Sequence, residues 1–357
     1  MTKKIGARRP DLHAGLARAL DVLGVIDAAL LARRFLPPPL LPALTYHRLA
    51  LPSPGDSFDR GVVDASAGEF ERQVALLVRS FTLVGVDELW SYFYQGRPLP
   101  PNPAMITFDD GYRSCHDVAL PILARHRAKA VFFVSTGHVG GRRVFWWDKI
   151  SYLVYRSARR RLVLERPAPA EYDLEGDRAP VVRALLSVVK VRPRLDVDGF
   201  VAEVARAAGV PWDERKERQF ADELVMTWDH ARALRRAGMG VQSHSRWHRV
   251  LHTLSEPELD AELGGSRADL EAALDESPRA VAYPVGHGPA PGSPFARAVV
   301  RAGYELGFTN ATGTNLLREG LSPLHLRRIA VEPGRTQAYF RASVALPLPA
   351  QRAGPPT

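Results

Sequence analysis

The sequence predicts an α/β protein whose strands form a closed or nearly closed barrel. Short, continuous apolar runs such as residues 104–108 and 130–134 alternate with segments of helical periodicity, a pattern typical of parallel strands buried on both faces. Seven or eight of these strand–helix units follow one another, a number that suits an α/β barrel. The chain lacks the glycine motif of dinucleotide-binding sheets, so a barrel is favoured over an open, doubly wound sheet.

The first expected element is an amphipathic helix over residues 11–35, where apolar side chains recur at helical spacing until a run of prolines, residues 37–39, ends it. Residues 40–46 form the first expected strand, which ends at His47. Later strands are predicted where an apolar run is short and unbroken, namely at residues 82–86, 104–108, 130–134, 239–243, 280–283, 306–309 and 326–331. Helices are predicted where apolar residues recur every three or four positions, namely at residues 70–81, 87–95, 115–126, 229–237, 256–274 and 294–302.

Residues 146–226 interrupt this alternation. The segment is rich in charged residues and helical patterns and has few strand candidates, so we interpret it as a helical insertion on one face of the barrel. We therefore expect an N-terminal helix and a Pro-rich linker over residues 1–40, a barrel over residues 41–345, and a tail over residues 346–357. The tail is predicted to be disordered because proline is frequent in it and it is terminal.

Composition limits the compartment and the partners. Of the 357 residues, 46% are hydrophobic and 24% are charged, as in a soluble globular protein. The net charge is +9, but the basic stretches are not interleaved with aromatic residues, so nucleic acid is not an expected partner. An acidic glycan or a membrane surface bearing anionic lipids suits the charge equally well. Cys115 is the single cysteine, which excludes an internal disulfide and fits a reducing compartment.

The N-terminus carries no recognisable signal peptide, and no apolar run reaches the roughly 18 residues that a membrane span needs. We therefore expect a cytoplasmic protein. The helix over residues 11–35 is flanked by arginines. It would either pack against the barrel behind it or lie on the inner membrane surface, where the protein would be peripheral.

Two distant segments place metal ligands where buried strands should end. Asp109 and Asp110 follow the apolar run at residues 104–108, and His244 and His248 follow the run at residues 239–243. One carboxylate and two imidazoles form a three-ligand set that leaves coordination positions open for water and substrate. The other carboxylate is free to act as a base. Either motif alone is weak evidence, but together they outline a metal-assisted hydrolase.

The segments Thr107–Tyr112 (TFDDGY) and His244–His248 (HSRWH) resemble the first two signature motifs of the polysaccharide deacetylases, the NodB-homology group or carbohydrate esterase family four. The likeness extends over roughly residues 41–340 and includes residues 45–48, 121–123, 130–134 and, for the third motif, 282–286.

This resemblance implies a distorted barrel of about seven strands and one divalent metal ion, often zinc. It also implies that Asp110, His244 and His248 hold the metal and that Asp109 is the general base. Four further residues would line the site or stabilise the oxyanion, with the backbone N–H of Val285 as the matching oxyanion donor; they are Tyr112, Trp247, Tyr283 and Val285.

The sequence departs from the family pattern at two places. The third motif usually opens with an arginine that orients the base, but Ala282 stands there, and Arg327 or Arg328 is the candidate replacement. The general acid is usually a histidine from a late motif; His325 is nearest to that place, and His47 and His287 are its rivals.

The expected function is therefore that of a metal-dependent amide hydrolase, a carbohydrate N-deacetylase acting on a glycan or a glycan precursor. Two alternatives stay open. The same fold could hydrolyse a non-sugar amide or imide bond, or the chain could be an inactive glycan-binding relative, which Ala282 would favour.

Overall fold

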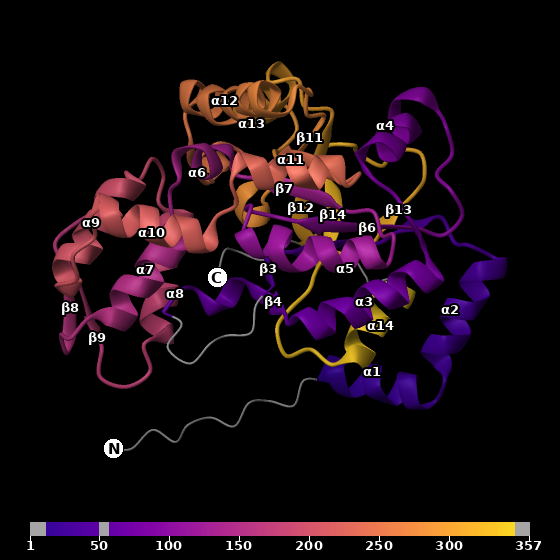
Figure 1. Ribbon diagram of the computed structural model, residues 1–357, viewed down its shortest axis with the longest axis horizontal. Coiled ribbons are helices and arrows are strands. Elements are labelled where there is room, and N and C mark those ends of the chain that lie inside the picture. The colour runs from indigo at the N-terminus through magenta and orange to yellow at the C-terminus, as the bar shows by residue number, and fades with distance from the viewer. Residues whose placement is uncertain (1–11, 50–56, 347–357) are drawn as a thin grey trace.

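The computed structural model describes residues 12–49 and 57–346 of the chain, which form a barrel surrounded by helices (Figure 1). Seven parallel strands close the barrel, because β6 pairs with β7 on one side and with β2 on the other. In their order around the barrel the strands are β2 (Ala43–Tyr46), β14 (Leu326–Ala330), β12 (Leu306–Thr312), β11 (Ala280–Ala282), β10 (Gly240–Ser243), β7 (Val131–Val134) and β6 (Pro103–Phe108). The predicted barrel of about seven strands is confirmed.

The barrel strands are almost wholly apolar because both of their faces are buried. Along β6, Met105 belongs to the cluster that fills the barrel, whereas Ile106 and Phe108 belong to the cluster beneath the surrounding helices. Side chains alternate along a strand, so Thr107 and then Asp109 fall on the inner side. The position of the strand end therefore decides which of the two adjacent aspartates points into the barrel.

Helices and short strands cover the barrel. Among the helices between barrel strands are α3 (Ala67–Ser80), α4 (Val86–Gln95), η2 (Cys115–Ala119), α5 (Leu120–Arg125), α6 (Thr136–Gly141), α11 (Trp228–Arg236), η3 (Leu251–Thr253), α12 (Glu256–Leu274), η4 (Pro284–Gly286) and α13 (Pro294–Arg301), and α14 (Gln337–Ala345) follows the last strand. Outside the barrel, β5 (Thr82–Leu83) pairs with the start of β6, β1 (Leu40–Leu41) with β13 (Asn315–Leu316), and β3 (Arg48–Leu49) with β4 (Val63–Ala65), which η1 (Arg60–Val62) precedes.

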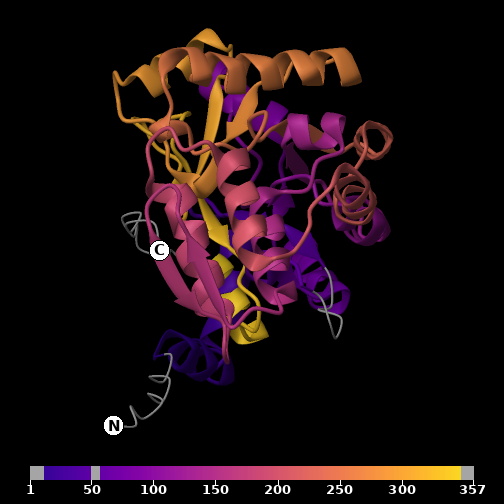
Figure 2. The ribbon, with the colours of Figure 1, turned by 90° about the vertical axis from the view of Figure 1, so that its left-hand side faces the viewer.

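Between Trp146 and Met226 the chain contributes no strand to the barrel. Its elements are α7 (Trp146–Arg156), β8 (Arg161–Leu164), β9 (Ala170–Asp173), α8 (Ala179–Val191), α9 (Val197–Ala208) and α10 (Glu214–Leu224). They gather at one side of the molecule, the left of Figure 1 and the front of Figure 2. The antiparallel pair β8 and β9 adds strands to a segment in which the sequence favours helices.

The N-terminal segment forms two helices, α1 (Leu12–Val22) and α2 (Val25–Phe35), where the sequence predicts one. The break lies at Gly24, whose φ of 72° is in the left-handed region that glycine adopts without steric cost. The two helices pack on α14 and α3. Apart from Leu346, the predicted disordered tail of residues 346–357 lies outside the described residues.

Candidate metal centre

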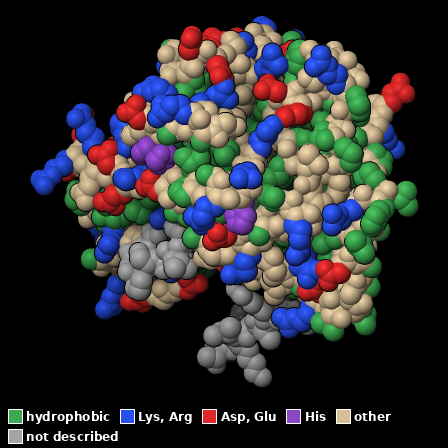
Figure 3. Space-filling model, turned by 45° about the vertical axis from the view of Figure 1, so that its right-hand side comes forward, with side chains coloured by type: hydrophobic (Ala, Val, Ile, Leu, Met, Phe, Trp, Pro, Cys, Tyr) green, Lys and Arg blue, Asp and Glu red, His purple; other side chains and the backbone are tan. Residues whose placement is uncertain are grey.

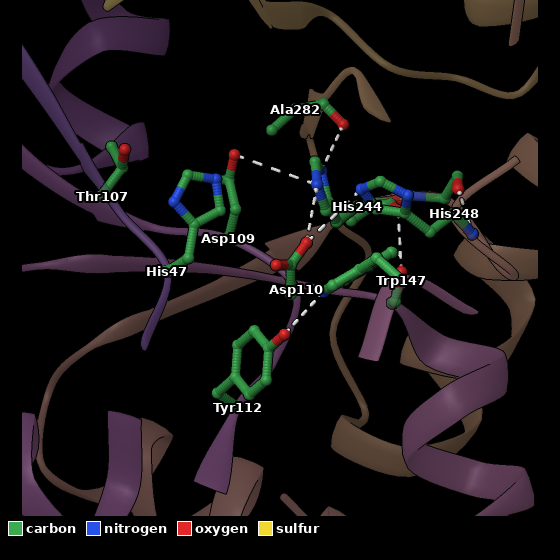
Figure 4. Close-up of polar contacts among 12 residues, drawn as sticks. His47, Thr107, Asp109, Asp110, Tyr112, Trp147, His244, His248 and Ala282 are labelled. Carbon is green, nitrogen blue, oxygen red and sulfur yellow. Dashed lines mark hydrogen bonds and ion pairs between the residues drawn. The ribbon is translucent and has the colours of Figure 1, made fainter. Parts of the chain in front are cut away.

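The carboxyl ends of two barrel strands bring the predicted ligands together. Asp110 lies two residues beyond β6, and His244 directly follows β10. Only β7 separates these parallel strands, so both open at the same end of the barrel, where α/β barrels place their active sites. His248 lies in the loop that follows His244, and its side chain turns back toward Asp110 (Figure 4).

The three side chains converge on one point. The Oδ1 atom of Asp110 lies 3.3 Å from Nε2 of His244 and 3.4 Å from Nε2 of His248. All three residues are buried, and their ligand atoms lie within 4.8 Å of one another. One ion could contact all three atoms after small movements, because metal–ligand distances are about 2.0–2.2 Å for zinc.

Hydrogen bonding and burial prepare these groups for a cation. Nδ1 of His244 donates to the carbonyl oxygen of Ala282 at 2.8 Å, which orients Nε2 toward Asp110. Burial and the nearby His244 lower the pKa of His248 to about 3, so this ring stays neutral and can act as a ligand. Oδ1 of Asp110 and Nδ1 of His248 are buried without hydrogen-bond partners, a costly state that a bound cation would relieve at the carboxylate. The residues therefore fit a divalent metal ion.

Two of the three ligands, and the residue that follows the third, lie on strained backbone. Asp110, Ser245 and His248 have φ angles of 72°, 60° and 50°, all in the left-handed region that non-glycine residues rarely adopt. Such strain persists only where surrounding contacts fix the chain, and it concentrates at functional sites.

Asp109 has very different surroundings. Arg328 donates two hydrogen bonds of 2.7 Å to its two carboxylate oxygens and a third, of 3.0 Å, to the carbonyl oxygen of Thr309. Burial opposes ionisation, but Arg328 and His244 together lower the pKa of Asp109 to about 2. Arg328, rather than Arg327, reaches Asp109 because alternate side chains of β14 point into the barrel, and Leu326 and Arg328 are the inward pair.

His47 faces both aspartates from the end of β2 (Figure 4). Asp64, from β4, accepts a hydrogen bond from the backbone N–H of His47 and lies 3.2 Å from its Nδ1 atom. Burial opposes the charged ring, yet Asp64, Asp110 and Asp109 together raise the pKa of His47 to about 10. The ring is therefore an imidazolium at neutral pH.

Tyr112 lies beneath the metal centre and offers no face to a substrate, which corrects the expectation that it lines the cleft. Its side chain is 1% exposed, and its hydroxyl donates to Asp148 at 2.7 Å and accepts from Nε1 of Trp147 at 2.7 Å. The ring of Trp147 packs on His248 with centroids 4.5 Å apart. Burial raises the pKa of Asp148 to about 7. These buried contacts, from Asp148 through Tyr112 to Trp147, hold the proposed metal ligand His248 in place.

The third-motif segment combines a buried tyrosine with two residues in the left-handed region. Tyr283 is fully buried, and its hydroxyl donates to the carbonyl oxygen of Leu324, so it too does not line the site. Val285 has a φ of 61°, which is unusual for a β-branched residue. Gly286, with a φ of 78°, has no room for a side chain, since a Cβ there would lie 2.4 Å from the Cβ of Asn310.

The hydrogen bonds of His325 are made to residues outside the metal centre. Its Nε2 atom is 2.6 Å from the carbonyl oxygen of Pro289, and its Nδ1 atom is 3.1 Å from the hydroxyl of Ser322. His287 packs against His252, with ring centroids 5.1 Å apart. Among the described residues, no hydrogen bond or ion pair joins either histidine to Asp109 or Asp110, whereas His47 faces both.

Trp247 is the aromatic side chain that stays accessible beside the ligands, with 37% of its surface exposed. It borders a cavity of about 460 Å³ to which Trp146, Arg194 and Arg249 also contribute. The ring rests on the backbone of Gly137, where a Cβ would lie 2.6 Å from ring atoms. A sugar ring could stack on the exposed face of Trp247.

A second group of possible ligands, His116, Asp117 and His230, lies at the surface. Asp117 is already paired with Arg113 at 2.7 Å. Nδ1 of His230 accepts a hydrogen bond from the backbone N–H of Thr227, so its ring proton is on Nε2 and no lone pair remains for a metal. This group fits an ion less well than the buried triad.

Two residues of the site escape simple motif reading. Asp64 lies in a short apolar stretch, residues 62–65. A lone carboxylate in such a stretch is the sequence feature that could have marked it as a buried residue of the site. Arg328 was one of two candidates, and the inward phase of its strand distinguishes it from Arg327.

The sequence and the fold of the chain are similar to those of known proteins. A sequence model described as polysaccharide deacetylase matches residues 96–161 and 202–310. Among solved structures, the Streptococcus pyogenes deacetylase PplD in complex with acetate superposes with a TM-score of 0.54 at 18% identity, covering 83% of this chain and 93% of the other. IcaB from Ammonifex degensii gives a TM-score of 0.51 at 19% identity, with coverages of 86% and 96%. A polysaccharide deacetylase from Bacillus cereus gives 0.53 at 15% identity, with coverages of 85% and 69%. No curated protein matches the chain significantly.

Proposed function

We propose that this chain is a member of the polysaccharide deacetylase family and a metal-dependent amide hydrolase that removes N-acetyl groups from an amino sugar in a glycan or a glycan precursor. The observation that carries the proposal is the convergence of Asp110, His244 and His248 on one point, directly beside the ionised pair of Asp109 and Arg328.

We assign the metal to Asp110, His244 and His248. One carboxylate and two imidazoles suit zinc and leave positions open for ligands other than protein. A divalent ion held there supplies Lewis acidity, which polarises the amide carbonyl and makes a neighbouring water more acidic.

Asp109 is the proposed general base. It is ionised, since the pKa is lowered to about 2, and it is held at the site by the two hydrogen bonds from Arg328. Positioning of this kind matters because a base must lie within hydrogen-bond reach of the proton that it accepts. Arg328 thus takes the place left empty by Ala282 in the third motif.

His47 replaces His325 as the proposed general acid. It is protonated, faces Asp109 and Asp110, and is oriented by Asp64. It would donate its proton to the amine that leaves the sugar. The backbone N–H of Val285 is the proposed donor to the oxyanion, and Trp247 the proposed stacking surface for the sugar.

These contacts favour catalysis over an inactive glycan-binding role. The argument for inactivity was the alanine at position 282, and Arg328 supports the base from another strand. Within the described part of the chain, no contact at the site favours a non-sugar amide over an amino sugar. The cytoplasmic location stays a prediction from the sequence.

The proposal is tested by acetate release from N-acetylhexosamine oligomers and lipid-linked N-acetyl sugars, with metal content measured in the same preparation. We expect about one divalent ion per chain, acetate release, and loss of both after chelation. Protein that binds an ion but releases no acetate from any of these substrates would contradict the choice of substrate. Protein that binds no ion would contradict the mechanism.

A further inference from the structure

The N-terminal helix pair, α1 with α2, carries an unusual share of the exposed apolar surface. Seven of the fourteen large hydrophobic side chains that are exposed within residues 12–49 and 57–346 belong to this short segment and the residues at its ends. They are Leu16, Val22, Leu23, Val25, Leu31, Phe35 and Leu36, with exposures from 41% to 83%. The other seven are scattered over the rest of the chain, so the concentration marks an interaction surface.

The opposite face of the helix pair is fixed to the barrel. Ile26 and Leu30 are buried in the main core. Arg33 is also buried, where it donates to the side chain of Asn102 and to the carbonyl oxygen of Ala345 in α14. The exposed apolar face is therefore a feature of a well-packed element.

The charges around this face are cationic. Both acidic residues of the described helix pair, Asp21 and Asp27, are paired with Arg341 of α14. Arg18 and Arg34 are exposed and form no ion pair within the described residues. The sequence just ahead of α1 adds further lysines and arginines, at positions 3, 4, 8 and 9.

Apolar side chains bordered by unpaired cations are the pattern of helices that lie in the plane of a membrane interface. Within the part of the chain that the structure describes, every helix is too short or too polar to cross a bilayer. Figures 1 and 2 both show α1 and α2 at the foot of the molecule, and hydrophobic side chains are visible along the right-hand side in Figure 3. We propose that the N-terminal helix pair docks in the plane of a bilayer surface that contains anionic lipids.

Vesicle binding by the full chain tests this proposal without reference to the enzymatic activity. Binding is measured by sedimentation with vesicles of phosphatidylcholine alone, or with roughly a third phosphatidylglycerol. We expect the wild type to bind the anionic vesicles at least about tenfold more tightly than the neutral ones. Leu23→Asp with Phe35→Asp should weaken that binding by roughly a hundredfold, because both side chains are exposed and would enter the interface.

Matched controls separate this face from the general surface. Val163→Asp with Val300→Asp changes two exposed apolar residues elsewhere and should bind as the wild type does. Arg18→Glu with Arg34→Glu should abolish the preference for anionic vesicles, whereas Arg215→Glu with Arg218→Glu, which changes the net charge equally, should retain most of it.

Three outcomes would overturn the proposal. The wild type could stay in the supernatant with anionic vesicles, or Leu23→Asp with Phe35→Asp could bind them as the wild type does. The third outcome is that, without vesicles, the wild type sediments as a dimer and this variant as a monomer, in which case a second copy of the chain covers the face.

Discussion

Asp109 and Asp110 are neighbours in the chain and are similarly buried, yet their carboxylates have different hydrogen-bond partners. The charge of Asp109 is balanced by Arg328 through two hydrogen bonds. Asp110 faces two imidazoles, of which His248 is neutral, and its Oδ1 atom has no hydrogen-bond donor. A buried carboxylate oxygen without a hydrogen-bond donor indicates a site for a cation from outside, whereas a carboxylate bound through both oxygens to a guanidinium is already neutralised by the protein.

The largest effect is expected from His244→Ala, which removes a ligand on the Asp110 side. Metal content and acetate release should both fall below detection, because two remaining ligands hold an ion weakly. His252→Ala is the matched control, since His252 packs against His287 and does not belong to the triad. If His244→Ala kept its metal, the proposed ligand set would be wrong.

Asp109→Asn tests the other side of the comparison. The variant should keep its metal and lose roughly 10²–10⁴-fold in kcat, the range that general-base catalysis contributes. Metal analysis of Asp110→Asn, which should lose the ion, provides the contrast. Loss of the ion from Asp109→Asn instead would exchange the roles of the two aspartates.

Arg328→Met should destabilise the fold by about 3–5 kcal/mol, because Asp109 would stay buried without its partner. Denaturant unfolding measures this change. Arg327→Met, on the same strand but half-buried, should have a clearly smaller effect. Equal destabilisation by the two substitutions would argue against a special role for Arg328.

His47→Gln should lower kcat by roughly 10²-fold at neutral pH, because the proton donor is lost. In the wild type, kcat should fall as the pH rises toward about 10, where His47 deprotonates, and a nearby divalent ion would move this limb to lower pH by repelling the proton. The raised pKa also stabilises the fold; this contribution is complete below pH 6.5 and is lost as the pH rises through about 10. A pH profile of His47→Gln that keeps the alkaline limb would assign the acid elsewhere.

The smallest effect is expected from Trp247→Ala. The side chain of Trp247 packs against His138 and its backbone N–H donates to Glu262, and within the described structure it contacts neither aspartate. Loss of a stacking surface should raise KM up to about tenfold and leave kcat nearly unchanged. Steady-state kinetics on an N-acetylhexosamine oligomer would show the split. A fall in kcat with KM unchanged would point to a role in holding the loop of His248.

The sequence predicted most of the barrel because its signals are local. Unbroken apolar runs such as residues 104–108 and 130–134 mark strands buried on both faces, and the structure has β6 and β7 there. The break of the first helix at Gly24 was missed because a single glycine is tolerated within a helical pattern and only packing on α14 and α3 sets the angle between the two halves.

By itself, the sequence predicted the resemblance to the polysaccharide deacetylases, the strands of the barrel, and the two segments whose ligands could share an ion. Only the tertiary structure decided which charged residues from other strands contact these segments. Arg328 from the last strand pairs with Asp109, and Asp64 from a short outer sheet raises the pKa of His47. The tertiary structure also buried Tyr112 and Tyr283, which the sequence assigned to the cleft. The physical reason is that charge compensation and burial depend on distances across the barrel, and no local pattern of residues records those distances.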